Sequence, residues 1–170
     1  MARWDAIEDE QFTTFVRTSR GQLRRSAYLL CNDWHEADDL VQVALIAVLR
    51  HWRRLRTSRN ALPFARRVLV NAFLMERRRV RHQREELVEQ IPEGDAASGV
   101  QVEDRLLLFA ALSRLGPRQR AVIVLRLWED LSVAQTARIL ECSPATVTSQ
   151  ASRALTALRD TFGDFGHSDG

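Results

Sequence analysis

The residue types that most often carry enzyme chemistry are present in this chain but are not arranged for it. The four histidines are scattered: His35, His51, His82 and His167. None has the HExxH spacing of a zinc hydrolase, and there is no glycine-rich phosphate loop or nucleophile elbow. Asp38 and Asp39 are adjacent, so on a helix they point about 100° apart and do not share a site. We therefore expect no catalytic residue, and the chemistry of this chain should lie in binding.

Metal, cofactor and membrane binding are not indicated either. Cys31 and Cys142 lie far apart without CxxC or Cys/His ligand spacing, which argues against a disulfide framework and a zinc site. No stretch approaches the roughly 18 apolar residues that span a bilayer. The N-terminal MARWDAIEDE is acidic, unlike a signal peptide. We expect a cytoplasmic protein that needs no metal or cofactor and contacts no membrane.

Charge is sorted into blocks along the 170 residues, and one block indicates the kind of partner. The net charge is only +3, and all 25 basic residues are arginines. Residues 50–84 carry 12 of them against the single Glu76, a net +11, whereas residues 85–104 carry seven acids and no base. A positive charge this concentrated favours a polyanionic partner over an ordinary solvated surface.

The hydrophobic periodicity is helical throughout and predicts an all-α fold. Residues 12–30 form one amphipathic helix or a helix pair. Asp33 with Glu36 resembles a capping box at the start of a long helix that reaches Trp52. That helix has two apolar stripes: one holds Leu40, Ala44, Val48 and Trp52, and the other holds Val41, Leu45 and Leu49. Either the helix is buried on both sides, or the second stripe docks a partner helix.

An arginine-rich face is predicted on the next helix, over residues 64–84, after a loop over residues 53–63. Its polar sector holds Arg67, Asn71, Arg78 and Arg81, flanked by Arg66 and Arg77. Its core side is expected to hold Phe64, Val68, Ala72 and Met75. Guanidinium groups pair with phosphates and stack on bases, so this face suits contact with unpaired nucleic acid.

Residues 85–104 differ in composition from both flanks and indicate a flexible acidic linker. Pro92, Gly94 and Gly99 would break a helix there. The linker separates two helical domains, which are followed by a polar tail. The expected ranges are residues 1–84 and 105–162 for the domains and 163–170 for the tail.

The last two predicted helices have the features of a helix-turn-helix. Ser132 with Gln135 forms a capping box at the first helix, and Ser143 before Pro144 begins the second. The turn between them, ECS, has the three residues that the motif requires. Its first residue, Glu141, stands where glycine is more common because the backbone takes positive φ. Close packing of the two helices would fall on Ala137 and Val147. An ordinary helical hairpin is the alternative.

The second of these helices starts with SPATVTSQASR and has a single cation, Arg153. Its capped start exposes backbone N–H groups and a positive helix end, which can meet phosphate without a charged side chain. Gln150 can pair with N6 and N7 of adenine, and Thr148 can contact a thymine methyl or a phosphate. We interpret this helix as weighted towards base contact, with residues 50–84 supplying the bulk attraction.

The order of these parts resembles a known family. The motifs are LLCNDWHEADDLVQVALIAVLRHW, FARRVLVNAFLMERRRVR, an acidic linker, and LSRLGPRQRAVIVLRLWEDLSVAQTARILECSPATVTSQASRALTALR. From Phe12 to Arg159 they resemble the extracytoplasmic-function class of bacterial RNA polymerase sigma factors, particularly its actinobacterial members. Thr148 and Gln150 depart from many relatives, which have Lys or Arg at those positions.

The resemblance implies a two-domain helical factor that joins core RNA polymerase and directs it to promoter DNA. The first domain would dock on the coiled coil of the largest subunit and hold the melted −10 element. The second would sit on the flap and read the −35 duplex. The implied core-polymerase contacts are Asp38, Asp39, Leu40, Gln42 and Leu45. The implied −10 contacts are Arg56, Arg59, Asn60, Arg66, Arg67, Asn71 and Arg78. The implied −35 contacts are Ser143, Thr146, Thr148, Ser149, Gln150 and Arg153.

Two other functions stay open at this point. One is a stand-alone helix-turn-helix regulator of duplex DNA whose N-terminal half dimerises or senses a signal. The other is an adaptor that binds polymerase without opening promoters. The acidic linker and the arginine face favour the sigma factor over the regulator, whereas the sparse cations of the last helix keep the adaptor open. The resemblance also leaves an anti-sigma factor open as a further partner.

Overall fold

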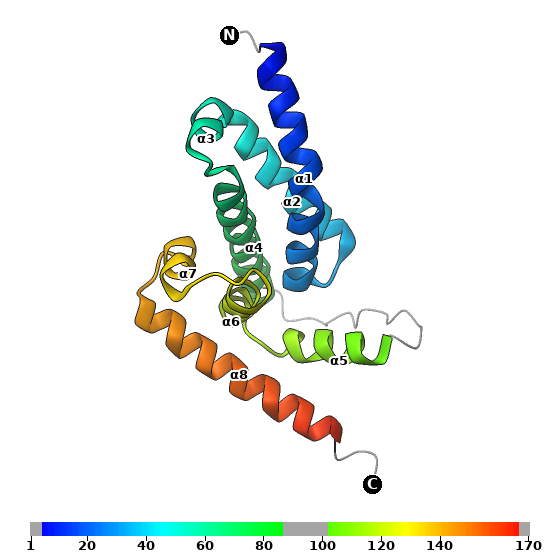
Figure 1. Ribbon diagram of the computed structural model, residues 1–170. Helices are drawn as coiled ribbons and strands as arrows, with labels where there is room; N and C mark the ends of the chain where they lie inside the picture. Colours follow the sequence, from blue (N-terminus) through cyan, green and yellow to red (C-terminus); the bar gives the residue numbers. More distant parts are fainter. Residues whose placement is uncertain (1–4, 87–101, 167–170) are drawn as a thin grey trace. The chain divides into compact units, whose positions relative to one another are not determined.

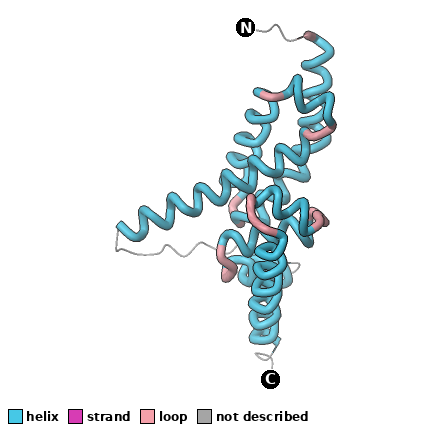
Figure 2. The backbone as a smooth tube through the Cα atoms, turned by 90° about the vertical axis from the view of Figure 1, so that its left-hand side faces the viewer, coloured by secondary structure: helices cyan, strands magenta, loops and turns pink. Residues whose placement is uncertain are grey.

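The computed structural model describes residues 5–86 and 102–166, and every regular element in these ranges is helical (Figure 1; Figure 2). In chain order they are α1 (Ala6–Cys31), α2 (Trp34–Arg50), α3 (Trp52–Ser58), α4 (Ala61–Glu86), α5 (Val102–Ser113), α6 (Pro117–Ile123), the π-helical turn η1 (Val124–Trp128), α7 (Val133–Leu140) and α8 (Pro144–Gly166). The prediction of an all-α fold is confirmed. α8 continues four residues past the predicted domain end at residue 162.

The chain divides into two compact units, Met1–Phe73 and Leu74–Gly170, and the boundary falls inside α4. Most of the predicted acidic linker, residues 87–101, lies outside the described residues. The division into domains over residues 1–84 and 105–162 therefore stays a prediction.

In the first unit, α1 is one continuous helix that folds back into α2 through a tight connection. α1 ends at Cys31 because Asn32 takes the left-handed conformation, with φ at 55°, and bonds back to a carbonyl of the last turn. Oδ1 of Asp33 then accepts hydrogen bonds from the backbone N–H groups of His35 (2.7 Å) and Glu36 (3.0 Å). Asp33 is the N-cap of α2, as predicted.

The core between α1 and α2 is made of fully buried side chains: Leu23, Ala27, Leu30, Ala37, Ala44 and Val48. Leu40 and Val41 are also buried, so both predicted stripes of α2 are covered near its N-terminus. Further along, the second stripe opens, because Leu45 is half-buried and Leu49 is 37% exposed. The first alternative, burial on both sides, therefore holds for the start of α2, and the docking of a partner helix by its exposed end stays a prediction.

The predicted boundaries around residue 52 are wrong. α2 ends at Arg50, and His51 breaks it with φ at −114° and ψ at 14°. Trp52 begins a separate seven-residue helix, α3, in place of the predicted loop. α4 starts at Ala61, so Pro63 lies in its first turn, where a missing backbone N–H costs nothing. The sequence predicts a loop that ends at this proline, and that prediction is wrong.

The buried side of α4 also differs from the prediction. Phe64, Val68 and Ala72 are half-buried, and Met75 is 67% exposed. The core is reached instead by Ala61, Ala65, Leu69 and Phe73. At 100° per residue the four predicted positions lie roughly 60–140° from Arg67, beside the arginine sector, whereas the buried four are centred opposite it.

In the second unit, α6 and η1 supply the most buried segment, and α5, α7 and α8 complete the helical core. Pro117 is the first residue of α6, as predicted, and residues 121–125 are all buried. In η1 the N–H of Glu129 bonds to the carbonyl of Val124 (2.9 Å), the spacing of a π-helix. Leu127 and Trp128, within this turn, are 62% and 51% exposed.

Candidate functional site

A groove of about 500 Å³ between α1 and α2 gathers side chains of the kind expected to dock a helix. α2 lines it with Asp38, Asp39, Val41, Gln42, Leu45, Ile46 and Leu49, and α1 lines it with Phe12, Val16 and Arg20. Polar groups thus lie toward the start of α2, and an apolar strip toward its end. The arrangement suits an amphipathic helix with a polar end.

Four of the five predicted core-polymerase residues line this groove, and Leu40 does not. Leu40 is only 6% exposed and lies in the core, where it can support the surface but not touch a partner. Ile46 (43% exposed) and Leu49 provide the apolar contact area instead. Sequence reasoning missed Ile46 and the α1 wall, because the wall forms only when Phe12 and Val16 are brought against α2.

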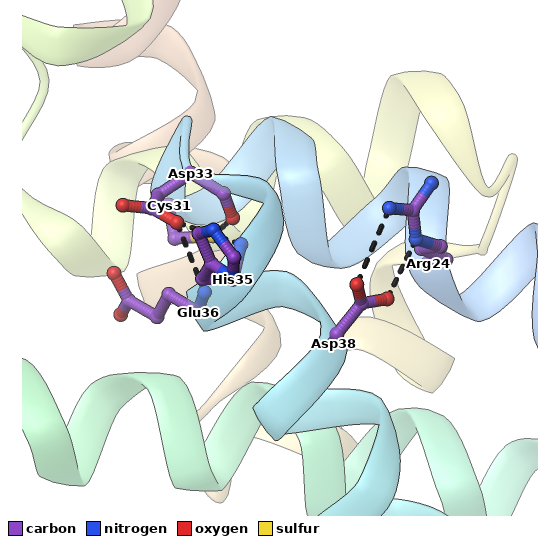
Figure 3. A network of polar contacts seen from close by, with 6 residues as sticks. All are labelled: Arg24, Cys31, Asp33, His35, Glu36 and Asp38. Atoms are coloured by element: carbon purple, nitrogen blue, oxygen red, sulfur yellow. Dashed lines mark hydrogen bonds and ion pairs between the residues drawn. The ribbon is translucent and has the colours of Figure 1, made fainter.

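Arg24 of α1 holds Asp38, one of the residues that line the groove (Figure 3). Its Nε donates to Oδ1 of Asp38 (2.6 Å) and its Nη2 donates to Oδ2 (3.3 Å). The same guanidinium lies 4.1 Å from the ring centroid of Trp34, which stacks on Tyr28 with centroids 3.8 Å apart. The carboxylate of Asp38 is therefore held in one orientation, while Asp39 beside it is exposed.

This ion pair also sets the protonation of Asp38. The hydrogen bond from Arg24 is the main reason that the pKa of Asp38 lies below its ordinary value, and the charges of Arg20 and His35 act in the same direction. The hydrogen bond to Asp38 likewise raises the pKa of Arg24. The groove keeps a fixed anionic group at its polar end at neutral pH.

A second hollow, of about 540 Å³, lies where α1 meets α3 and the start of α4. α1 lines it with Glu10, Gln11, Thr14, Phe15 and Ser19, and the other wall consists of Trp52, Leu55, Arg56, Arg59, Ala61 and Leu62. Arg59 ends α3 in the left-handed conformation, with φ at 55°. The carbonyl of Asn60 accepts the N–H of Phe64 (2.9 Å), so α4 follows without a longer loop.

The predicted −10 residues fall into three groups. Arg59, Asn60 and Arg67 are exposed, and Arg66 and Asn71 are half-buried on α4. Arg56 forms an ion pair with Glu8 of α1, Nη2 to Oε1 at 3.1 Å. Arg78 is exposed on α4 but belongs to the second compact unit, so its place in this site remains a prediction.

In the second unit, α7 and α8 form the predicted helix-turn-helix. Ser132 Oγ accepts from the N–H of Gln135 (3.1 Å), and Gln135 Oε1 accepts from the N–H of Ser132 (2.8 Å), which confirms the capping box. Glu141 ends α7 with φ at 53°, as expected of this turn position. Ala137 and Val147 are buried, as predicted.

The start of α8 is capped and its leading side chains are exposed. Oγ of Ser143 accepts from the N–H of Thr146 (3.1 Å), and the hydroxyl of Thr148 donates to the carbonyl of Pro144 (3.1 Å). The exposed predicted residues are Ser143, Thr146, Thr148, Ser149 and Arg153. Gln150 is half-buried, and its Oε1 has no hydrogen-bond partner among the described residues. That oxygen is also buried, so in this rotamer it is not exposed for the pairing with adenine that the sequence predicts.

In the two described ranges, no helix combines the length and apolar character needed to cross a membrane. Over the same residues, His, Cys, Asp and Glu do not gather into a group of three or more that could hold a metal ion.

Two sections of the chain match known family models. Residues 15–83 match Sigma-70 region 2, which covers the α2 wall of the groove, α3 and most of α4. Residues 105–158 match Sigma-70, region 4, which covers the helix-turn-helix. The two matches define the class of protein: a sigma factor of the sigma-70 type.

Individual relatives place the chain within that class. The RNA polymerase sigma-E factor of Streptomyces coelicolor is 40% identical over 151 residues, 88% of this chain and 85% of that protein. The ECF RNA polymerase sigma factor SigM of Mycobacterium tuberculosis is 32% identical over 153 residues, 89% of this chain and 77% of that protein. The chain belongs to the extracytoplasmic-function class of RNA polymerase sigma factors, of actinobacterial type, and is an alternative sigma factor that directs transcription initiation.

A solved structure shows the same fold. It is the sigma factor RpoE in complex with the anti-sigma factor NepR from Bartonella quintana, with a TM-score of 0.70 and 23% sequence identity. The match covers 91% of this chain and 98% of that chain.

Proposed function

We propose that the groove between α1 and α2 docks the factor on core RNA polymerase, at the coiled coil of its largest subunit. The groove itself is the observation that carries the proposal. Exposed Ile46 and Leu49 can bury apolar residues of a partner helix, while Asp39 and Gln42 can bond its polar groups. Because Asp38 is held by Arg24, we expect Asp39 to be the acid that meets the partner.

We further propose that α3 and α4 hold the melted −10 strand. The hollow beside Arg59 is open to a base, and Asn60 precedes α4 at its edge. Arg67 and Asn71 lie further along the same helix, where guanidinium and amide groups can pair with phosphates or stack on bases. These contacts would hold the strand, whereas the hollow would contribute sequence preference.

The helix-turn-helix is proposed to read the −35 duplex, with the rest of residues 105–162 on the polymerase flap. The capped start of α8 presents backbone N–H groups to a phosphate. Ser149 and Arg153 are exposed and can reach base edges in the major groove, with Thr146, Thr148 and Gln150 beside them.

The chain would act by binding alone, in the cytoplasm, while the polymerase performs the chemistry. We also propose an anti-sigma factor as a partner to be tested, because the sigma factor from Bartonella quintana with the same fold is solved with one. Residues 87–101 would connect the two DNA-binding parts.

A reconstituted transcription assay tests the proposal. The purified chain with core polymerase on a promoter library should give discrete transcription starts. Binding of core without promoter opening would support the adaptor instead. Specific binding to duplex DNA without core would support the stand-alone regulator.

Two variants on α2 test whether the groove docks core polymerase. Ile46→Asp places a charge in the groove and should weaken core binding about tenfold or more, about 1.4 kcal/mol, in a titration with labelled core polymerase. Val43→Asp is the matched control, because Val43 is 48% exposed on α2 but does not line the groove. Equal loss with both variants would exclude the groove as the docking site.

A further inference from the structure

Glu8, in the first turns of α1, is a buried acid that lies before the section matched by Sigma-70 region 2. Glu8 is only 5% exposed. Oε2 accepts a hydrogen bond from Nε of Arg53 (3.2 Å), and Oε1 pairs with Nη2 of Arg56 (3.1 Å). Oε1 of Gln11, one turn further along α1, accepts from Nη1 of Arg56 (3.2 Å). One carboxylate therefore engages two arginines of α3.

A buried carboxylate such as that of Glu8 needs oppositely charged partners. Removing a charge from water is costly unless it is paired, so Glu8 stabilises the fold only with Arg53 and Arg56 in place. The pair is unlike an ordinary surface salt bridge, because the Glu8 side chain is 7% exposed while Arg56 is 32% exposed. Because separating Glu8 from these arginines would leave a buried charge unpaired, the ion pairs keep α3 packed against α1.

Aromatic packing beside the Glu8 ion pairs also holds α3 against α1. Trp52, the first residue of α3, is 5% exposed and packs on Phe12 and Phe15, with ring centroids 5.3 and 5.6 Å apart. A helix of seven residues is too short to be stable alone, so its place depends on α1. α3 ends at Ser58, and its position therefore sets where the connection through Arg59 and Asn60 to α4 begins.

We propose that Glu8 is a positioning residue for the −10 loop, by which we mean the two residues Arg59 and Asn60 between α3 and α4, and this rests on the proposed function of α3 and α4. It holds Arg53 and Arg56 as structural cations, so that they place the loop and do not bind phosphate. Arg59 and Asn60, at the end of α3, are left to meet the melted strand. Arg56, expected from the sequence as a direct DNA contact, acts through Glu8 instead.

The proposal predicts two effects of opposite sign for Glu8→Gln. Two guanidinium groups lose their anion and become available to phosphate, so binding to non-specific DNA should tighten. The slope of log affinity against log salt should steepen by up to about 0.7 per freed contact on single strands. At the same time, the loop loses its anchor, so preference for the −10 element and the rate of promoter opening should fall.

The experiment compares full-length Glu8→Gln with Asp9→Asn, which removes the same charge from the exposed neighbouring position. Holoenzyme made with core polymerase is titrated against a −10 fork junction and a scrambled fork at several salt concentrations. Tighter scrambled binding with weaker −10 preference in Glu8→Gln alone is the expected result. Loss of affinity for both forks, or behaviour equal to Asp9→Asn, would overturn the proposal. If wild-type holoenzyme opens no promoter, the proposed function fails instead.

Arg56→Gln keeps the test decisive should Glu8→Gln fail to fold. If Arg56 is a positioning residue, Arg56→Gln leaves the slope of log affinity against log salt on scrambled DNA unchanged, while promoter opening slows. An Arg56 that binds phosphate directly lowers the slope by about 0.7, and that result would overturn the proposal.

Discussion

The two DNA-facing regions of this sigma factor differ in where their positive character comes from. Residues 50–84, which include α3 and most of α4, carry 12 arginines against one acid. α8 of the helix-turn-helix carries Arg153 and Arg159 against Asp160 and Asp164, so it is neutral overall. Its positive end comes from the capped helix start at Ser143.

The difference matches the two forms of DNA. A melted strand is flexible, and guanidinium groups can both neutralise and stack on it. A duplex presents base edges at fixed positions, which a rigid capped helix can meet with short side chains such as Ser149. We infer that strength of attraction and sequence reading are divided between residues 50–84 and α8.

The largest expected effect comes from unfolding one region alone. Val147 is fully buried, so Val147→Asp should destabilise the second unit by about 4 kcal/mol or more. Hydrogen exchange should then show loss of protection in α7 and α8 but not in α1 and α2. Val133→Asp is the control, because an acid at the first position of α7 meets the positive helix end. Loss of protection throughout would mean that the regions do not fold independently.

The next effect concerns the arginine-rich region. Arg67→Ala with Asn71→Ala should slow promoter opening by roughly tenfold to a hundredfold, about 1.5–3 kcal/mol, because contacts to the melted strand are lost. Closed-complex binding should change less. Permanganate reactivity of unpaired thymines measures opening, and Arg25→Ala on α1 controls for the charge. Equal loss at both steps would remove this face from the melted strand.

A smaller effect tests the neutral helix. Thr148→Arg with Gln150→Arg adds two cations to the start of α8. The salt dependence of −35 duplex binding should steepen by about 0.9 per added phosphate contact. Asp160→Arg is the matched control, because it changes the net charge by the same amount further along α8. If neither variant alters −35 binding, α8 is not the reader and the adaptor alternative gains support.

Features that depend on local sequence were predictable. The caps at Asp33 and Ser132 and the left-handed Glu141 involve residues within one turn, so spacing alone identified them. The break at His51 was missed because the apolar pattern of α2 continues in register to Trp52 across it. Periodicity identifies a stripe but does not show where the chain turns.

Features that depend on tertiary contact were not predictable. The clamp of Glu8 on Arg53 joins residues 45 positions apart, and nothing local distinguishes Glu8 from Asp9 or Glu10. The buried side of α4 was misassigned because apolar residues surround most of its arginine sector, and only packing decides which of them, such as Leu69, is covered. The groove residues of α2 were mostly found because they form a periodic stripe.

The smallest effect is expected at the docking groove, where one acid is held by an ion pair. The lowered pKa of Asp38 means that its bond to Arg24 contributes stability above the ordinary carboxyl pKa, and that this contribution is lost as pH falls through the lowered value. The stability difference between wild type and Asp38→Asn should therefore be full at neutral pH and vanish in acid. Urea unfolding at several pH values measures it, with Asp39→Asn as the neighbouring control. A difference that persists in acid would show that Asp38 stabilises the fold through packing and not through its charge. The groove would then depend on neutral contacts, as α8 does, more than on charged groups, as residues 50–84 do.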